Sequence, residues 1–189
     1  EQVTEAYENY DVTNATRPVQ EFVEQLSNWY VRLSRRRFWK SANDTDKLGA
    51  YATLYEGLTT VATLIAPAMP FMSDALYRNL VADLDPDAPD SVHLGTWVES
   101  NPALIDRALS NEMALVQRLV SLGLAARNEA QVRVRQPLAS ANILLANKED
   151  AVIVNQYRDL IASELNIKTV NVVEDASDMV QYSLNPLPA

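Results

Sequence analysis

The hydrophobic period of the sequence changes once, close to Glu129, and this change limits the possible folds more than any other feature. Before it, apolar residues recur every three or four positions over long stretches, as in amphipathic helices. After it, short alternating or apolar runs typical of strands flank one helical stretch. The sequence therefore predicts a mainly α chain. A helical bundle is expected over residues 1–129, and a small α/β subdomain of strand–helix–strand order over residues 130–189.

Prolines and capping residues set the expected helix boundaries. Residues 1–10 have the pattern of a helix end, and Thr16 is predicted to cap the next helix, with Pro18 in its first turn and an end near Lys40. The following helix should begin near Asp44 and stop before Pro67. Further helices are predicted over residues 70–81, 102–128 and 151–165, and strands over residues 141–146 and 169–173.

One stretch, residues 26–40, carries local positive charge in an acidic chain. The whole chain has 16 basic and 25 acidic residues and a net charge of -9, whereas this stretch contains no acidic residue. Its aromatic residues are Trp29, Tyr30, Phe38 and Trp39. Basic residues with interleaved aromatic rings are typical of surfaces that contact phosphates and stack on unpaired bases.

Helical spacing divides this stretch into two faces. One face is apolar and is expected to be buried; it consists of Phe22, Leu26, Trp29 and Leu33. The other face offers an amide, two guanidinium groups and an indole ring from Asn28, Arg32, Arg35 and Trp39. The alternative interpretation of the second face is a solvated cationic surface with a tryptophan at its edge.

Other features exclude several classes of function. The chain has one histidine and no cysteine, which excludes the usual nucleophilic constellations and a thiolate-held zinc ion. His93 is expected to pack or to form a hydrogen bond. No apolar run is long enough for a transmembrane helix, and the N-terminal residues do not have the pattern of a signal peptide.

Four segments, in order, resemble the anticodon-binding region of isoleucyl-tRNA synthetases, which are class I enzymes. They are Ser27–Arg32 continuing to Arg37, Ala66–Met72, Ser91–Leu94, and Ala126–Asn128 continuing into Val134–Leu138. The first resembles the first long helix of that region, and the second resembles the proline–phenylalanine turn after its second helix. The last two look specific to the isoleucine enzyme, and the resemblance extends from about residue 5 to residue 184.

The resemblance implies the anticodon-binding helical bundle of class I synthetases, followed by a small α/β subdomain. It implies that the whole enzyme ligates isoleucine to its tRNA using ATP and Mg²⁺ in the cytoplasm. The catalytic motifs of the family are absent here, so the chain alone is expected to be inactive, with no catalytic residue, metal or cofactor. The implied partners are tRNA(Ile) and the catalytic domain of the same polypeptide, without membrane or DNA.

Ten residues are the candidate RNA contacts. The best candidates are Asn28, Arg32, Arg35 and Trp39. Phosphate contacts are expected from Arg36, Arg37 and Lys40, and a weaker second patch from Arg127, Arg133 and Arg135. Surface charges flanking a strand are the alternative for that patch.

Two other functions stay open at this point. A helical structural or protein-interaction bundle without an RNA role would have the same periodicity. The equivalent region of a valyl- or leucyl-tRNA synthetase would share the bundle as well.

Overall fold

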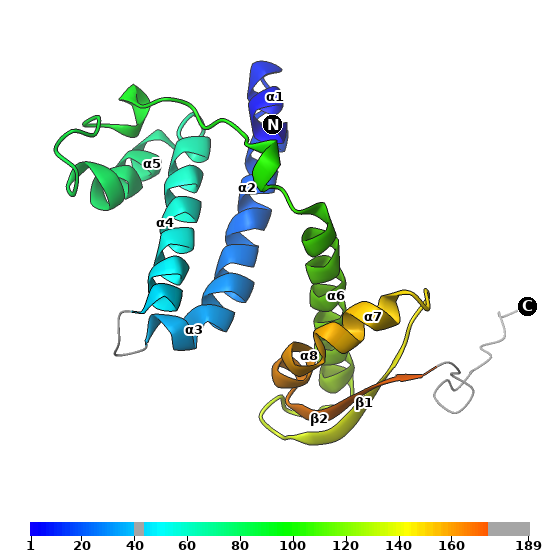
Figure 1. Ribbon diagram of the computed structural model, residues 1–189. Helices are drawn as coiled ribbons and strands as arrows, with labels where there is room; N and C mark the ends of the chain where they lie inside the picture. The colour runs from blue at the N-terminus through cyan, green and yellow to red at the C-terminus, as the bar shows by residue number, and fades with distance from the viewer. Residues whose placement is uncertain (40–43, 174–189) are drawn as a thin grey trace, which may run out of the picture. The chain divides into compact units, whose positions relative to one another are not determined.

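The structure is a computed structural model that describes residues 1–39 and 44–173 of the chain. The chain forms two compact units, Glu1–Pro102 and Ala103–Ala189 (Figure 1). The domain boundary predicted at residues 129 and 130 falls inside the second unit, at the C-terminal end of its long helix. That helix is grouped with the strands because it packs against the helix that connects them.

All regular elements described in the first unit are helical. In this unit α4 runs beside α2 and α3 and also packs against α5 (Figure 1). The elements are α1 (Gln2–Glu8), α2 (Val12–Gln25), the π-helical turn η1 (Leu26–Val31), α3 (Arg32–Phe38), α4 (Thr45–Ile65), α5 (Pro70–Tyr77), the π-helical turn η2 (Arg78–Ala82) and the 3₁₀ turn η3 (Val92–Leu94). A second 3₁₀ turn, η4 (Pro102–Leu104), spans the division between the units.

Side-chain caps explain where two of these helices begin. Asp11 caps α2 by accepting a hydrogen bond of 3.0 Å from the amide of Asn14. The cap predicted at Thr16 is therefore wrong, and the Thr16 hydroxyl instead donates to the carbonyl oxygen of Val12, one helical turn earlier. Asp44 caps α4 by accepting from the amide of Lys47 at 2.8 Å, which confirms the predicted start of that helix.

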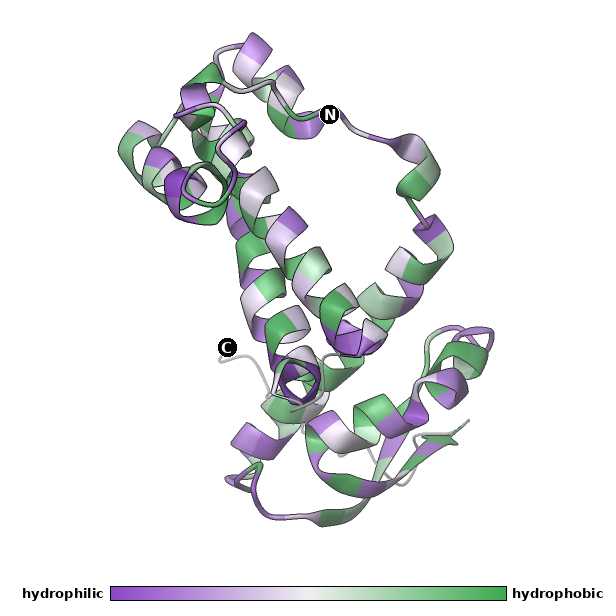
Figure 2. Cartoon of the chain, turned by 60° about the vertical axis from the view of Figure 1, so that its left-hand side comes forward, coloured by the Kyte–Doolittle hydropathy of each residue, from purple (hydrophilic) through white to green (hydrophobic). Residues whose placement is uncertain are grey.

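One cluster of buried apolar side chains in the first unit lies at the contact of α1, α2 and α4. It consists of Val3, Ala15, Val19 and Val61. The side chains of Leu48, Tyr51 and Tyr55, in the first half of α4, are exposed, although their spacing of three and four residues is that of one face of an amphipathic helix. Helix α4 instead buries Ala50, Val61 and Ala62. Hydrophobic residues accordingly appear on several sides of the helices in Figure 2.

Asp74 holds the segment after the Asp85–Asp90 loop against α5. Its Oδ1 accepts from the hydroxyl of Ser91 at 2.6 Å and from the amide of Val92 at 3.3 Å, and its Oδ2 accepts from Nε of Arg78 at 2.8 Å. These donors hold the pKa of Asp74 below its ordinary value of 3.8, with the Ser91 hydroxyl contributing most. Nearby, Nε2 of His93 lies 3.2 Å from the carbonyl oxygen of Pro70, which confirms the hydrogen-bonding role expected for this histidine.

Asp74→Asn is expected to reduce the loss of stability on acidification. The folded chain favours the carboxylate of Asp74, so its contribution to stability is present above pH 3.8 and disappears as the pH falls through the lower folded-state pKa. Thermal melts from neutral pH to below 3.8 would measure the difference. The matched control is Asp83→Asn, at an exposed carboxylate of the same unit. Equal pH dependence in the parent and in Asp74→Asn would contradict this prediction.

The second unit contains the predicted α/β arrangement. Two parallel strands, β1 (Leu138–Leu144) and β2 (Ile167–Val173), pair with Ala141 opposite Val170, and helices connect them. The strand–helix–strand order and the mainly α fold class are thus confirmed. The elements are α6 (Arg107–Glu129), β1, α7 (Asp150–Gln156), α8 (Arg158–Leu165) and β2.

The two faces of this small sheet differ. The side chains of Val170, on β2, and Val154, on α7, are buried, as is that of Ile161 on α8. On the opposite face, the side-chain Nδ2 of Asn171 donates to the side-chain Oδ1 of Asn142 at 3.0 Å, and both residues are exposed. The apolar face of the sheet therefore contributes to a core with the connecting helices, while the other face is polar.

Candidate nucleic-acid interface

The π-helical turn η1 changes which residues of the basic stretch face α4. In a π turn the backbone bonds connect residues five apart instead of four, so the following side chains are rotated relative to a regular α-helix. Tyr30 consequently points toward α4 and donates from its hydroxyl to the carbonyl oxygen of Ala50 at 3.0 Å. Ser34, rather than Leu33, is buried in α3.

The buried face predicted for this stretch is therefore not formed. Phe22 and Leu26 lie against α4, with side-chain carbons 3.6 Å from where a Cβ on Gly57 would stand, but Phe22 is 44% exposed and Leu26 is half-buried. Trp29 and Leu33 are also only half-buried, so the prediction of a buried stripe is wrong for all four residues. An ideal period of 100° per residue fails here because η1 inserts a wider turn.

The four best candidates for RNA contact are all on the surface. Asn28, Arg32 and Arg35 are exposed, and Trp39 is 80% exposed. The guanidinium carbon of Arg35 lies 5.9 Å from the centre of the Trp39 ring. A cation placed over an indole face in this way is weakly attracted to it, so the pair presents a charge and a ring together.

A second pair of the same kind lies one turn earlier. The guanidinium carbon of Arg32 is 5.9 Å from the centre of the Trp29 ring, and its Nε donates to the carbonyl oxygen of Asn28 at 2.9 Å. Two guanidinium–indole pairs thus follow one another along η1 and α3.

The side chains expected to contact phosphates differ in exposure and in the hydrogen bonds that they already make within the chain. Arg36 is exposed. Arg37 instead joins α3 to the start of α4, because its Nε donates to a carboxylate oxygen of Asp46 at 2.8 Å and one Nη donates to the Asp46 carbonyl oxygen at 3.1 Å. The candidate Lys40 lies outside the described residues.

Aromatic contacts fix the C-terminal end of α3 on α4. The centre of the Phe38 ring lies 5.0 Å from the centre of the Tyr51 ring and 6.4 Å from the centre of the Tyr30 ring. Tyr51 and Tyr55 are themselves exposed. The sequence did not predict this exposure, because their helical spacing with Leu48 is the pattern of a buried face.

The structure does not leave Arg127 available to RNA. It is 5% exposed, and one Nη donates to the carbonyl oxygens of Arg133 at 3.0 Å, Val134 at 3.3 Å and Gln136. Its guanidinium holds the segment between α6 and β1 in place, so we remove it from the candidate contacts. Arg133 and Arg135 are exposed in that segment.

In the described part of the chain, no three histidine, aspartate or glutamate side chains lie together in a group that could hold a metal ion. No helix within residues 1–39 and 44–173 combines the length and the apolar character needed to cross a membrane.

Comparison with known proteins identifies the family. Residues 1–143 match the family model for the anticodon-binding domain of tRNA ligase. The chain is 46% identical to the isoleucine–tRNA ligase of Dehalococcoides mccartyi over 91% of its own length and 17% of the relative's. It is 44% identical to the enzyme of Clostridium novyi over 97% of the chain, again 17% of the relative, and 43% identical to that of Thermus thermophilus over 98% of the chain and 18% of the relative.

The chain thus spans roughly a sixth of the curated relatives that it matches, and it matches them over nearly its whole length. These matches confirm the resemblance carried by the four sequence segments. The chain belongs to the family of anticodon-binding domains of tRNA ligases, in the form found in isoleucine–tRNA ligases.

Proposed function

We propose that this chain is the tRNA(Ile)-binding region of an isoleucine–tRNA ligase and that η1 and α3 present its main RNA-facing surface. The observation that carries this proposal is the Arg35–Trp39 pair, an exposed indole beside an exposed guanidinium on a helix held against α4. The family match supports the RNA partner, and the relatives' shared name supports the isoleucine specificity.

The chemistry of the surface suits an RNA with unpaired bases. Arg32 and Arg35 can donate two parallel hydrogen bonds to a phosphate or to a base edge. Trp39 can stack on an unpaired base, and Arg36 can contact phosphate, which positions the RNA without reading its sequence. Arg37 contributes mainly by fixing α3 to α4, since its side chain already bonds Asp46.

The proposal extends to the whole enzyme. The catalytic domain of the same polypeptide would activate isoleucine with ATP and Mg²⁺ in the cytoplasm, outside the residues of this chain. The chain alone would then give no isoleucine-dependent pyrophosphate exchange.

Trp39→Ala is expected to weaken tRNA(Ile) binding by about 1–3 kcal/mol, because a base loses its stacking partner. Arg35→Ala should weaken binding too and should lower the slope of log affinity against log salt by about one unit if Arg35 contacts phosphate. The measurement is filter binding of tRNA(Ile) over a salt series, with thermal melts on the same preparations.

Two matched controls separate this surface from general effects. Phe71→Ala removes a ring that is 91% exposed, and Arg17→Ala removes an exposed arginine of α2. Both should bind tRNA(Ile) like the parent. If Trp39→Ala and Arg35→Ala also bind like the parent, the basic helix is a solvated face. Equal affinity for tRNA(Val) would argue against isoleucine specificity within this region.

A further inference from the structure

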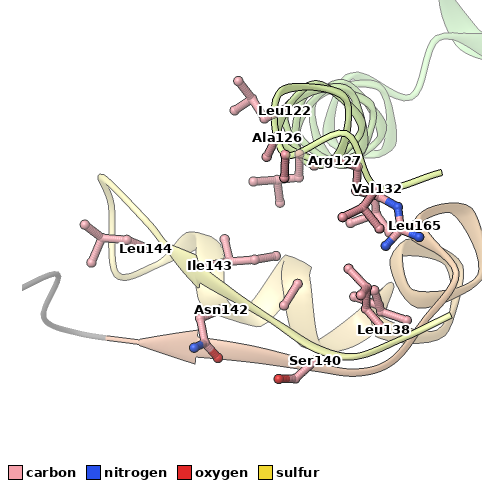
Figure 3. A pocket seen from close by; sticks show the side chains of 15 residues that line it. Leu122, Ala126, Arg127, Val132, Leu138, Ser140, Asn142, Ile143, Leu144 and Leu165 are labelled. Carbon is pink, nitrogen blue, oxygen red and sulfur yellow. The ribbon is translucent and has the colours of Figure 1, made fainter. Parts of the chain in front are cut away.

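The second unit contains an apolar cavity of about 410 Å³ between α6 and β1 (Figure 3). Leu122 and Ala126 line it from α6, and Ile143 and Leu144 line it from β1. The cavity is open to solvent, since Leu122 and Leu144 of its lining are 59% and 49% exposed. It therefore leaves a contiguous apolar surface uncovered in this chain, and such surfaces mark sites of interaction.

Arg127 lies in the wall of this cavity and has donors that remain unused. Although it is 5% exposed, its Nε and one Nη have no hydrogen-bond partner among the described residues. Only the other Nη donates, to the carbonyl oxygens of Arg133, Val134 and Gln136. A buried guanidinium with unsatisfied N–H groups is costly, so the geometry calls for an acceptor close to Arg127.

Both outer edges of the sheet also lack a neighbour. Among the described residues the sheet has two strands, so β1 and β2 each pair on one edge only. The cavity is lined by six residues of β1 and by Ile167 alone from β2, so the open edge beside it is that of β1. The amide of Leu138 donates to Asn166 beside β2. Because alternate residues of a parallel strand turn their amides to opposite edges, those of Ser140 and Asn142 also face β2. The amides of Ala139, Ala141 and Ile143 therefore face the open edge.

We infer that an extended segment from the part of the full-length ligase beyond this chain adds to the sheet along β1. Its backbone pairs with Ala139, Ala141 and Ile143, its apolar side chains fill the cavity, and an acidic side chain or a carbonyl oxygen accepts from Arg127. Main-chain pairing with an open edge, combined with pockets for alternate side chains, is an established mode of recognition. This chain spans only 17% of its relatives, so most of the polypeptide is available to supply the segment.

The inference rests on the proposal that the chain is part of a longer ligase, but it does not depend on the RNA-facing surface. Hydrogen exchange of individual amides in the full-length ligase tests it. The parent should protect Ala139, Ala141 and Ile143. Ala126→Trp, which places an indole in the cavity, should speed exchange at these amides by about tenfold or more.

The strand provides its own internal reference, and α6 provides a matched control. Ser140 and Asn142, whose amides face β2, should stay protected in Ala126→Trp, showing that β1 remains folded. Ala125→Trp carries the same added ring at the neighbouring exposed position, outside the cavity lining, and should exchange like the parent. Affinity for tRNA(Ile) should be the same in all three proteins, which keeps this test separate from that of the proposed function.

Three results would overturn the inference. The amides of Ala139, Ala141 and Ile143 could exchange in the parent as fast as in an unfolded peptide. They could be protected equally in the parent and in Ala126→Trp. Protection that disappears on dilution would assign the edge to a second copy of the chain instead.

Discussion

Arg127→Ala is expected to lower the free energy of unfolding of the second unit by about 3 kcal/mol, from lost charge-assisted hydrogen bonds and lost packing. One Nη of Arg127 donates to the carbonyl oxygens of Arg133, Val134 and Gln136, and the side chain is almost fully buried. Without the guanidinium, the carbonyl oxygens of the segment between α6 and β1 lose their hydrogen-bond donor. Denaturant unfolding of the parent and the variant measures the difference.

Two further variants test the cause of this effect. Arg127→Lys keeps the charge but removes the planar group, so it should recover only part of the lost stability. Arg118→Ala changes an exposed arginine of the same helix and should stay within about 0.5 kcal/mol of the parent. If Arg127→Ala unfolds at the same denaturant concentration as the parent, then the carbonyl contacts do not stabilise residues 133–136.

Much of the fold could be predicted because local signals and packing agree. Asp44 caps α4 where expected, and the helix ends at Ile65, just before Pro67, since a proline cannot continue it. The change of period near Glu129 correctly separated long helices from the strand–helix–strand segment. The alternating run at residues 132–135 does not form a strand, because its carbonyl oxygens bond Arg127 instead of a neighbouring strand.

The candidate site was less predictable, because it depends on geometry that no local pattern encodes. A regular helical period placed Trp29 on a buried face, but the π-helical turn η1 rotates Tyr30 toward α4 instead. Arg127, in the last turn of α6, has the sequence context of a surface charge. Its burial depends on a following segment that folds back over it, and such a contact is visible only in three dimensions. The exposed Arg35 and Trp39 could be predicted, since both lie where charge and aromatic residues coincide.

Leu165→Ala is expected to destabilise the second unit by about 2–5 kcal/mol, because it removes a buried side chain from the contact of α8 with α6. Leu165 is buried at the end of α8 and packs directly on Gly123 of α6. A Cβ on Gly123 would stand 2.6 Å from one methyl carbon of Leu165 and 2.7 Å from the other, closer than any normal contact. Gly123→Ala should therefore cost about 1–3 kcal/mol through overpacking, although alanine is the better helix former.

The double variant shows whether these two effects have one cause. Once Leu165 is alanine, the added methyl group at position 123 has room, so Gly123→Ala should become neutral or stabilising by up to about 1 kcal/mol. Gly49→Ala is the matched control, because a Cβ on this glycine of α4 would meet nothing within 4 Å. It should stabilise the chain in both backgrounds. If Gly123→Ala is as favourable as Gly49→Ala in the parent, Leu165 moves aside at no cost, and the glycine is not required for α6 to pack on α8.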